Sequence, residues 1–173
     1  FEADIEQWLL TDGGYTKGDQ KTYDKERAID MTTLIKFLAS TQEKQWDRYV
    51  RKYGDKAENR LYQVFQENVV RYGLIWVLRN GIDDMGIKLK MCYFRPASEL
   101  NEELMRKYRQ NILQETRQFA YSTQNRNTID MVLSLNGIPV VALELKNQLT
   151  GQNIENSRDQ WKNDRDPAEL LFH

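Results

Sequence analysis

The sequence predicts an α/β domain, and three observations lead to this fold class. Apolar residues recur at helical spacing through the first half of the chain, whereas residues 112–121 and 129–147 alternate as strands do. The chain has 173 residues, 40% of them hydrophobic, which is enough to bury one core. With only 3 Pro and 9 Gly, it contains no obvious linker. We therefore expect a single domain over residues 1–173.

Helices are expected in the first half of the chain. A helix is predicted over residues 1–11, because its apolar residues share one face and Gly13 or Gly14 can end it in a left-handed conformation. The apolar run 74–79 fits neither a helix nor a strand clearly. Three further helices are predicted by the same periodicity, over residues 28–39, 42–53 and 56–71.

The second half mixes strands with helices. Residues 86–94 alternate like a strand, and residues 112–121 do so again. Between them, Ser98 can cap a short helix over residues 99–109. This order of elements is typical of an α/β domain.

The stretch 129–147, "IDMVLSLNGIPVVALELKN", is predicted to form a β-hairpin with charges at both ends. The large apolar rows of its two strands lie on one face only if paired residue numbers have an even sum. Leu133 then stands opposite Val141, and the same register places Asp130 opposite Glu144. The apolar pattern by itself therefore brings two carboxylates together.

The turn of this hairpin must agree with that register. A two-residue Asn136-Gly137 turn would pair residues whose numbers have an odd sum, which puts the two apolar rows on opposite faces. We therefore expect a three-residue loop with Gly137 at positive φ, or an equivalent bulge. Lys146 follows Glu144 by two residues and shares its face.

Two carboxylates across a sheet repel each other unless a divalent cation lies between them. Mg²⁺ fits, because it binds one or two carboxylates together with water and phosphate oxygens. Lys146 can position a hydrolytic water or offset charge on a phosphorane-like transition state. The pattern thus indicates metal-assisted phosphodiester hydrolysis. The alternative is a strand-edge salt bridge of Lys146 with Glu144 or Asp130.

Composition excludes several classes of site. One cysteine, Cys92, excludes a disulfide framework and a multi-cysteine zinc site, and the only histidine, His173, excludes serine triads and histidine-metal nucleases. The 25 Lys and Arg nearly cancel the 26 Asp and Glu, so any polyanion site must be local. No membrane span or signal peptide is evident, and we expect a soluble, cytoplasmic protein.

The hairpin resembles the core of the PD-(D/E)xK nuclease superfamily. Beyond it, "YGLIWVLRNGIDDMGIKLKMCYFRP", "YRQNILQETRQFAYS" and "LTGQNIENSRDQWKNDRDP" resemble the amino-terminal endonuclease domain of the restriction (R) subunit of type I restriction-modification enzymes. The phrase "NGIPVVALELKNQLTGQ" is specific to that subunit family. The resemblance implies a restriction-endonuclease-like core, a mixed β-sheet flanked by helices.

The resemblance also implies roles for residues of the hairpin. Asp130 and Glu144 match the metal-binding carboxylates, and Lys146 matches the catalytic lysine. The backbone carbonyl of Leu145 is implied as a further metal ligand.

Two helical positions match the family in part. Glu2 matches an acidic residue of the first helix that lies near the metal, although Glu6 is one turn further on and shares its face. Gln160 matches a glutamine that helps to orient the site; Trp161 and Asp164 depart from the family pattern around it. Glu2 and Glu6 can equally be solvated residues of the first helix.

The resemblance implies an endonuclease domain that cleaves double-stranded DNA with Mg²⁺, for which Mn²⁺ can substitute, beside methylation (M) and specificity (S) subunits. No G-x-x-x-x-G-K-[ST] phosphate loop is present, so ATP use is expected in motor regions of a longer, prokaryotic R subunit of which this chain is a fragment. The alternative is a catalytically inactive DNA-binding or docking module on the nuclease fold.

Two other groups of side chains allow a structural and a functional interpretation. Three tryptophans in apolar helical contexts are expected to pack in the core or between helices rather than to stack on bases; these are Trp8, Trp46 and Trp76. A basic stripe can be a solvated helix face or a phosphate-contacting surface; it comprises Lys44, Arg48, Arg51 and Lys52.

Overall fold

A computed structural model describes residues 2–98, 100–145, 154–163 and 165–172. Its contacts divide the chain into two compact units. The sheet unit comprises residues 1–29 and 113–173, and the helical unit comprises residues 30–112.

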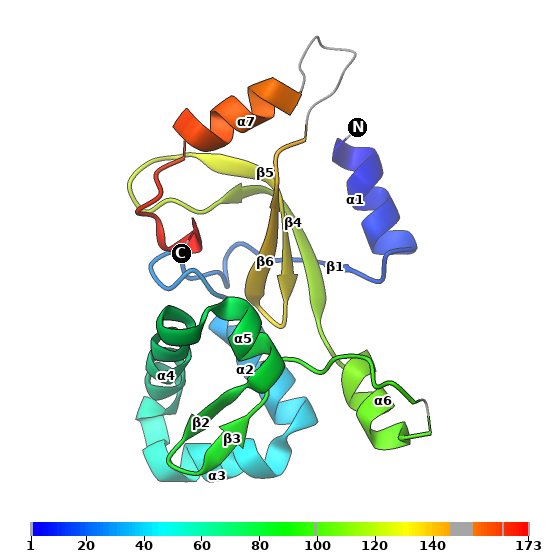
Figure 1. Cartoon of the computed structure of the whole chain (residues 1–173), viewed down its shortest axis with the longest axis vertical. Coiled ribbons are helices and arrows are strands. Elements are labelled where there is room, and N and C mark those ends of the chain that lie inside the picture. The colour runs from blue at the N-terminus through cyan, green and yellow to red at the C-terminus, as the bar shows by residue number, and fades with distance from the viewer. Residues whose placement is uncertain (1, 99, 146–153, 164, 173) are drawn as a thin grey trace. The chain divides into compact units, whose positions relative to one another are not determined.

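The sheet unit is built on a four-stranded sheet with the order β1-β4-β5-β6. β1 runs parallel to β4, and the other neighbouring strands are antiparallel, so the sheet is mixed, as predicted. Helices α1 and α7 lie on either side of this sheet (Figure 1). The elements are α1 (Glu2–Thr11), β1 (Thr16–Lys17), β4 (Leu113–Ala120), β5 (Thr128–Leu135), β6 (Ile138–Leu143), α7 (Ile154–Asn163) and the 3₁₀ helix η3 (Leu170–Phe172).

The β5–β6 hairpin has the predicted register in the part that lies away from its turn. Leu133 pairs with Val141 and Met131 with Leu143, which confirms the even sum. The turn differs from the first expectation: Leu135 pairs with Ile138, so only two residues form it, and a shift after Leu133 restores the even register. The three-residue loop is therefore wrong, and the equivalent bulge is correct.

Positive φ angles explain this turn. Asn136 has φ 54° and Gly137 has φ 82°, the left-handed pair that a type I′ hairpin turn requires. Asparagine and glycine adopt this conformation at the lowest steric cost. The preference of Asn136 and Gly137 for positive φ thus fixes the turn at two residues. The bulge after Leu133 is then needed to bring the apolar rows of the two strands onto one face of the sheet.

Aromatic and aliphatic side chains form the core on the α7 side of the sheet. Phe119, Tyr121, Ile129 and Val132 are buried together. Partly buried side chains pack against them from the rest of the sheet unit: Tyr23, Ala142, Trp161, Leu171 and Phe172.

The helical unit is mainly α-helical, with one short antiparallel hairpin, β2–β3 (Figure 1). The predicted helices are confirmed, and the unassigned run 74–79 is helical. The elements are α2 (Met31–Thr41), α3 (Glu43–Tyr53), the 3₁₀ helix η1 (Gly54–Lys56), α4 (Ala57–Tyr72), α5 (Leu74–Asn80), β2 (Ile82–Asp84), β3 (Ile87–Leu89) and α6 (Glu102–Arg109).

Several local expectations for this unit are corrected. The strand expected over residues 86–94 is limited to β3, and the helix after it is capped by Asn101, whose Oδ1 accepts the Leu104 N–H at 3.0 Å, rather than by Ser98. Trp46 is buried as expected, at 9% exposure. The other two tryptophans are not core residues, because Trp8 is 60% and Trp76 42% exposed; Trp76 instead packs between helices, stacked on Tyr72 of α4.

An ion pair lies within the core of the helical unit. Arg60 donates to both oxygens of the buried Asp84, at 3.0 and 2.7 Å, and the Tyr49 hydroxyl donates to Asp84 Oδ2 at 2.9 Å. The Arg60 guanidinium is the main cause that lowers the pKa of Asp84 to about 2. The β2–β3 hairpin is thereby tied to α3 and α4.

Within the described residues, no helix is both long enough and apolar enough to cross a membrane.

Candidate active site

The two carboxylates predicted to pair lie together at the open end of the β5–β6 hairpin. Asp130 precedes Met131, and Glu144 follows Leu143, the last pair in the ladder, so the register continues to Asp130 and Glu144. Asp130 is close enough for its charge and its carboxyl group both to raise the pKa of Glu144. The juxtaposition follows from strand alternation and register.

Asp130 also closes the hairpin by a hydrogen bond. Its Oδ2 accepts the backbone N–H of Leu145 at 2.7 Å. This bond fixes the orientation of the carboxylate across the two strands. It uses the N–H of Leu145 and does not involve its carbonyl oxygen, the predicted metal ligand.

Glu144 is paired with an arginine that the sequence did not single out. Arg165 Nη2 donates to Glu144 Oε1, and Arg165 Nη1 donates to the Tyr121 hydroxyl at 3.2 Å. The guanidinium lies over the rings of Tyr121 and Trp161, at 5.5 and 5.8 Å from their centroids. Arg165 is only 8% exposed, so this is a buried ion pair held in an aromatic cage.

Burial and charge act in opposite directions on Glu144. Loss of water raises the pKa of its carboxyl group, Arg165 opposes that shift, and Asp130 adds to it. The side chain is fully buried, and Oε2 has no hydrogen-bond partner among the described residues. A buried carboxylate oxygen without a partner, beside a second carboxylate, matches the donor set of a hard divalent cation.

No group of three or more His, Cys, Asp or Glu side chains comes together within the described part of the chain. A cation here would therefore rest on Asp130 and Glu144, with backbone, water or substrate oxygens completing its shell. Mg²⁺ tolerates such a site, because it commonly keeps several waters.

Two predicted site residues cannot be placed. Lys146 lies outside the described residues. Gln160 belongs to α7 by its backbone, but its side chain also lies outside the part that the structure describes. The roles assigned to both residues stay predictions.

The acids of α1 belong to a separate charge cluster. Glu2 Oε2 accepts from Gln118 Nε2 at 3.2 Å and lies 3.5 Å from Arg117 Nη2. Glu6 is held more tightly, with Lys17 at 2.9 Å and Arg117 at 2.7 Å. These two cations lower the pKa of Glu6, Arg117 most strongly.

This cluster lies on the other face of the sheet from the carboxylate pair. Arg117 pairs with Met131, and alternation directs Asp130 to the opposite face. Glu2 bonds to Gln118, which lies between the paired residues Arg117 and Phe119 of β4 and has a φ of 47°. Its metal-ligand role stays a prediction.

Arg165 is the residue of this site that pattern analysis missed. It lies 21 positions after Glu144 in the sequence and beyond α7. The only local signal is an arginine among acids in "KNDRDP", which many solvated loops share. Only the fold of the sheet unit brings it to Glu144.

The fold and the site define a class: a mixed α/β domain, nuclease-like in architecture, with two carboxylates paired across a hairpin of its sheet. The model of one protein family, the type I restriction enzyme R protein N terminus, matches residues 2–173. The chain belongs to this family. No curated protein and no solved structure matched the chain.

Proposed function

We propose that the chain is the endonuclease domain of a type I restriction enzyme R subunit, hydrolysing phosphodiester bonds of double-stranded DNA with Mg²⁺. The observation that supports this function is the pairing of Asp130 with Glu144, whose Oε2 is buried and lacks a partner among the described residues. The same pair is the one that the apolar pattern of the hairpin predicts.

In this proposal Asp130 and Glu144 hold the cation, with the Leu145 carbonyl as a further ligand. When bound, Mg²⁺ supplies Lewis-acid polarisation of the phosphate and a more acidic water. A water oxygen bonds to phosphorus and gives a proton to solvent, while the P–O bond to the leaving sugar oxygen breaks and that oxygen takes a proton from solvent to become a hydroxyl. Lys146 stabilises the negative charge that develops on the phosphoryl oxygens.

Arg165 acts as the competitor of the cation at Glu144. Two positive charges cannot both occupy one carboxylate without mutual repulsion. Metal binding therefore requires the Arg165 guanidinium to shift toward Tyr121 or to share Glu144. Until the metal and the substrate bind, the ion pair with Arg165 neutralises the charge of Glu144.

The partners and cofactors follow from the proposed role. Double-stranded DNA is the substrate, Mn²⁺ can replace Mg²⁺, and the M and S subunits supply methylation and sequence specificity. ATP use is assigned to motor regions of the complete R subunit.

A second candidate function is a catalytically inactive DNA-binding or docking module. Two contacts favour it: the buried Arg165–Glu144 ion pair and the Leu145 N–H bond to Asp130. Under this alternative the carboxylates only stabilise the sheet. The alternatives differ in whether the site binds a divalent cation.

Metal-dependent thermal stabilisation tests this difference. Under the nuclease proposal, Mn²⁺ at about 100 times its Kd raises Tm by about 5 °C or more, since ligand binding stabilises the folded state. Asp130→Asn abolishes the shift while keeping an oxygen for the Leu145 N–H. Asp55→Asn, at an exposed position, is the matched control and keeps the shift.

Arg165→Met sharpens the test. If Glu144 is a metal ligand, removing the Arg165 guanidinium increases the rise in Tm that Mn²⁺ produces. Absence of any metal effect in both the wild-type protein and Arg165→Met would favour the inactive module.

A further inference from the structure

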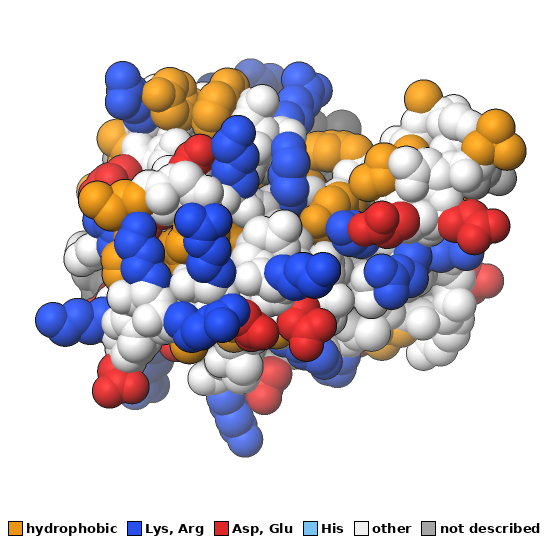
Figure 2. Space-filling view, turned by 90° about the horizontal axis from the view of Figure 1, so that it is seen from below, with side chains coloured by type: hydrophobic (Ala, Val, Ile, Leu, Met, Phe, Trp, Pro, Cys, Tyr) orange, Lys and Arg blue, Asp and Glu red, His pale blue; other side chains and the backbone are white. Residues whose placement is uncertain are grey.

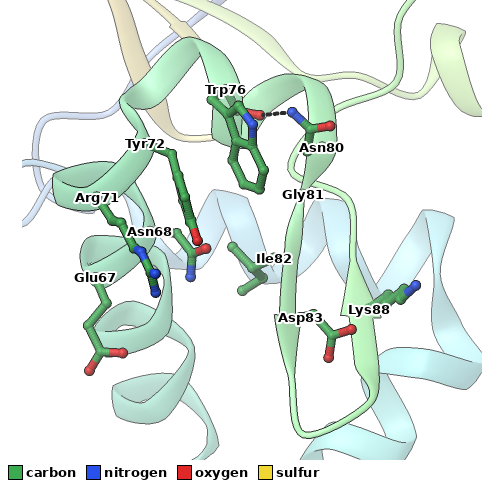
Figure 3. A pocket seen from close by; sticks show the side chains of 10 residues that line it. All are labelled: Glu67, Asn68, Arg71, Tyr72, Trp76, Asn80, Gly81, Ile82, Asp83 and Lys88. Atoms are coloured by element: carbon green, nitrogen blue, oxygen red, sulfur yellow. Dashed lines mark hydrogen bonds between the residues drawn. The ribbon is translucent and has the colours of Figure 1, made fainter.

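The helical unit contains a cavity of about 520 Å³ between the α4–α5 segment and the β2–β3 hairpin (Figure 3). This size suits one nucleotide-sized ligand. The lining combines aromatic, amide and charged side chains: Glu67, Asn68, Arg71, Tyr72, Trp76, Asn80, Gly81, Ile82, Asp83 and Lys88.

Two stacked aromatic rings form one wall of this aromatic pocket. Tyr72 and Trp76 have centroids 4.3 Å apart and planes inclined by 29°, and Arg71 lies over the Tyr72 ring at 5.1 Å. Both rings remain more than 40% exposed, at 44% and 42%. They form a fixed platform on which a flat ligand can stack.

The core does not need this platform. On α5 the buried side chains are Val77 and Leu78, so Trp76 is directed away from the apolar interior. Tryptophan and tyrosine are enriched at the energetically important positions of binding surfaces. The platform is therefore better explained by a ligand than by folding.

A second cavity, of about 360 Å³, adjoins the first through Lys88. Lys44 and Arg48 of α3 line it together with Lys88, and no acid does. None of these three cations forms an ion pair with another described residue. We call this cavity the basic groove; Lys and Arg side chains gather on the face that bears α3 and the β2–β3 hairpin (Figure 2).

The two cavities differ in charge in a way that matches the parts of a nucleotide chain. Glu67 and Asp83 line only the aromatic pocket, where they repel phosphate but accept hydrogen bonds from base N–H groups. The basic groove offers cations alone, which suit phosphates. Lys88 joins the two, as a sugar–phosphate link between base and backbone requires.

Local structure holds this arrangement in place. Alternation in β3 buries Ile87 and Leu89 and exposes Lys88. Lys88 stands opposite Asp83, whose Oδ1 accepts the Gly86 N–H at 2.9 Å and thereby holds the turn. Asp83 and Lys88 are thus held on a fixed hairpin, with the Lys88 side chain directed away from the aromatic rings (Figure 3).

We propose that the helical unit binds single-stranded DNA, with an unpaired base stacked in the aromatic pocket and the adjacent phosphates on Lys44, Arg48 and Lys88. The proposal rests on the proposed function only in taking DNA as the nucleic acid. A duplex can use the basic groove but cannot insert a paired base, so single strands bind more tightly.

The first test measures binding of the 173-residue chain to a fluorescein-labelled 12-nucleotide single strand, in metal-free buffer, by anisotropy. A duplex and an RNA strand of the same sequence are the comparison ligands. The single-stranded DNA binds more tightly than the duplex. Equal affinity for the single strand and the duplex would overturn the base pocket.

The second test removes the cations of the basic groove. The triple variant Lys44→Ala/Arg48→Ala/Lys88→Ala binds on the order of 10-fold more weakly at low salt, and the slope of log affinity against log salt falls by about 2. The control Lys36→Ala/Lys56→Ala/Arg106→Ala removes the same charge from exposed positions outside both cavities and retains most of the affinity. Equal losses in both variants would contradict the basic groove.

The third test addresses the aromatic pocket. Trp76→Ala weakens single-strand binding about 10-fold and duplex binding little, and Trp76→Phe retains part of the affinity. Bound single strand quenches tryptophan fluorescence in the wild-type protein and in the Trp8→Phe control, but not in Trp76→Phe. Persistence of the quenching in Trp76→Phe would overturn the stacking role.

These results are independent of the cleavage site. Asp130→Asn leaves single-strand binding unchanged, because Asp130 contacts neither cavity. A wild-type protein that binds single-stranded DNA but no divalent cation contradicts only the nuclease proposal, and one that binds the cation but no single-stranded DNA contradicts only this one.

Discussion

Two glutamates of the sheet unit, Glu115 and Glu144, lose their water on folding but meet different neighbours. Glu144 faces Arg165, whereas neither oxygen of Glu115 has a hydrogen-bond partner among the described residues. Burial, and then the charge of Glu6, raise the pKa of Glu115. At the scale of single residues, burial raises the pKa of both carboxyl groups, and of the two only Glu144 has an arginine as its hydrogen-bond partner.

Glu115→Gln tests this difference through pH. A raised pKa means that the folded state holds the proton more firmly, so the wild-type free energy of unfolding decreases as pH rises above the unfolded pKa of about 4.3. The amide removes that decrease. We expect the variant to gain on the order of 1 kcal/mol over the wild-type protein at pH 7 and little at pH 4.

Urea denaturation at both pH values measures this effect. Glu26→Gln, at an exposed position, is the control and should change stability equally at both pH values. A stability difference between Glu115→Gln and the wild-type protein that does not vary with pH would show that Glu115 titrates normally in the folded state.

At the scale of elements, the β5–β6 hairpin depends on two devices that act together. The Asn136-Gly137 turn starts the pairing with an odd sum, and the shift after Leu133 converts it to the even sum that pairs Asp130 with Glu144. β6 is the last strand in the sheet order, and Pro139 is tolerated in it because it is at an edge.

Gly137→Ala is the sharpest perturbation of this element. A φ of 82° is strained for alanine, so we expect a loss of about 1 kcal/mol or more in the free energy of unfolding. Asn136→Gly, at φ 54°, keeps the turn and should change stability by less. Chemical denaturation of both variants measures the contrast, and equal effects would argue against the two-residue turn.

At the scale of the whole molecule, a nearly neutral chain separates its charges locally. The 25 basic and 26 acidic residues nearly cancel, yet every charged residue that lines the basic groove is a cation, and the candidate active site contains paired carboxylates. The net charge therefore does not describe the local charge at either place.

Lys146→Ala separates cleavage from binding in the complete type I enzyme. Its charge matters chiefly as negative charge develops on the phosphoryl group, so we expect cleavage of unmethylated DNA to fall by about 100-fold or more. DNA association and ATP use should remain near wild-type levels. Lys162→Ala, at an exposed position on α7, is the control. Cleavage at the wild-type rate would instead favour a structural salt bridge for Lys146.

Much of the fold follows from local chemistry in the sequence. Helical periodicity predicted α2, α3 and α4 of the helical unit, because each buries one apolar stripe, but it left the run that forms α5 unassigned. The alternation in residues 129–145 specified the register, because a one-residue slip would turn every apolar side chain to the other face. The pairing of Asp130 with Glu144 is thus encoded in the apolar pattern rather than in the charges.

The features that depend on distant contacts were decided only by the tertiary structure. Periodicity marks an apolar stripe but does not show which of its members the neighbouring elements cover, so Trp46 is buried and Trp76 lines a pocket. Likewise, Arg165 reaches Glu144 only because the chain returns to the sheet after α7. Sequence determines what a segment can bury or pair with, whereas the packed chain determines which partner it meets.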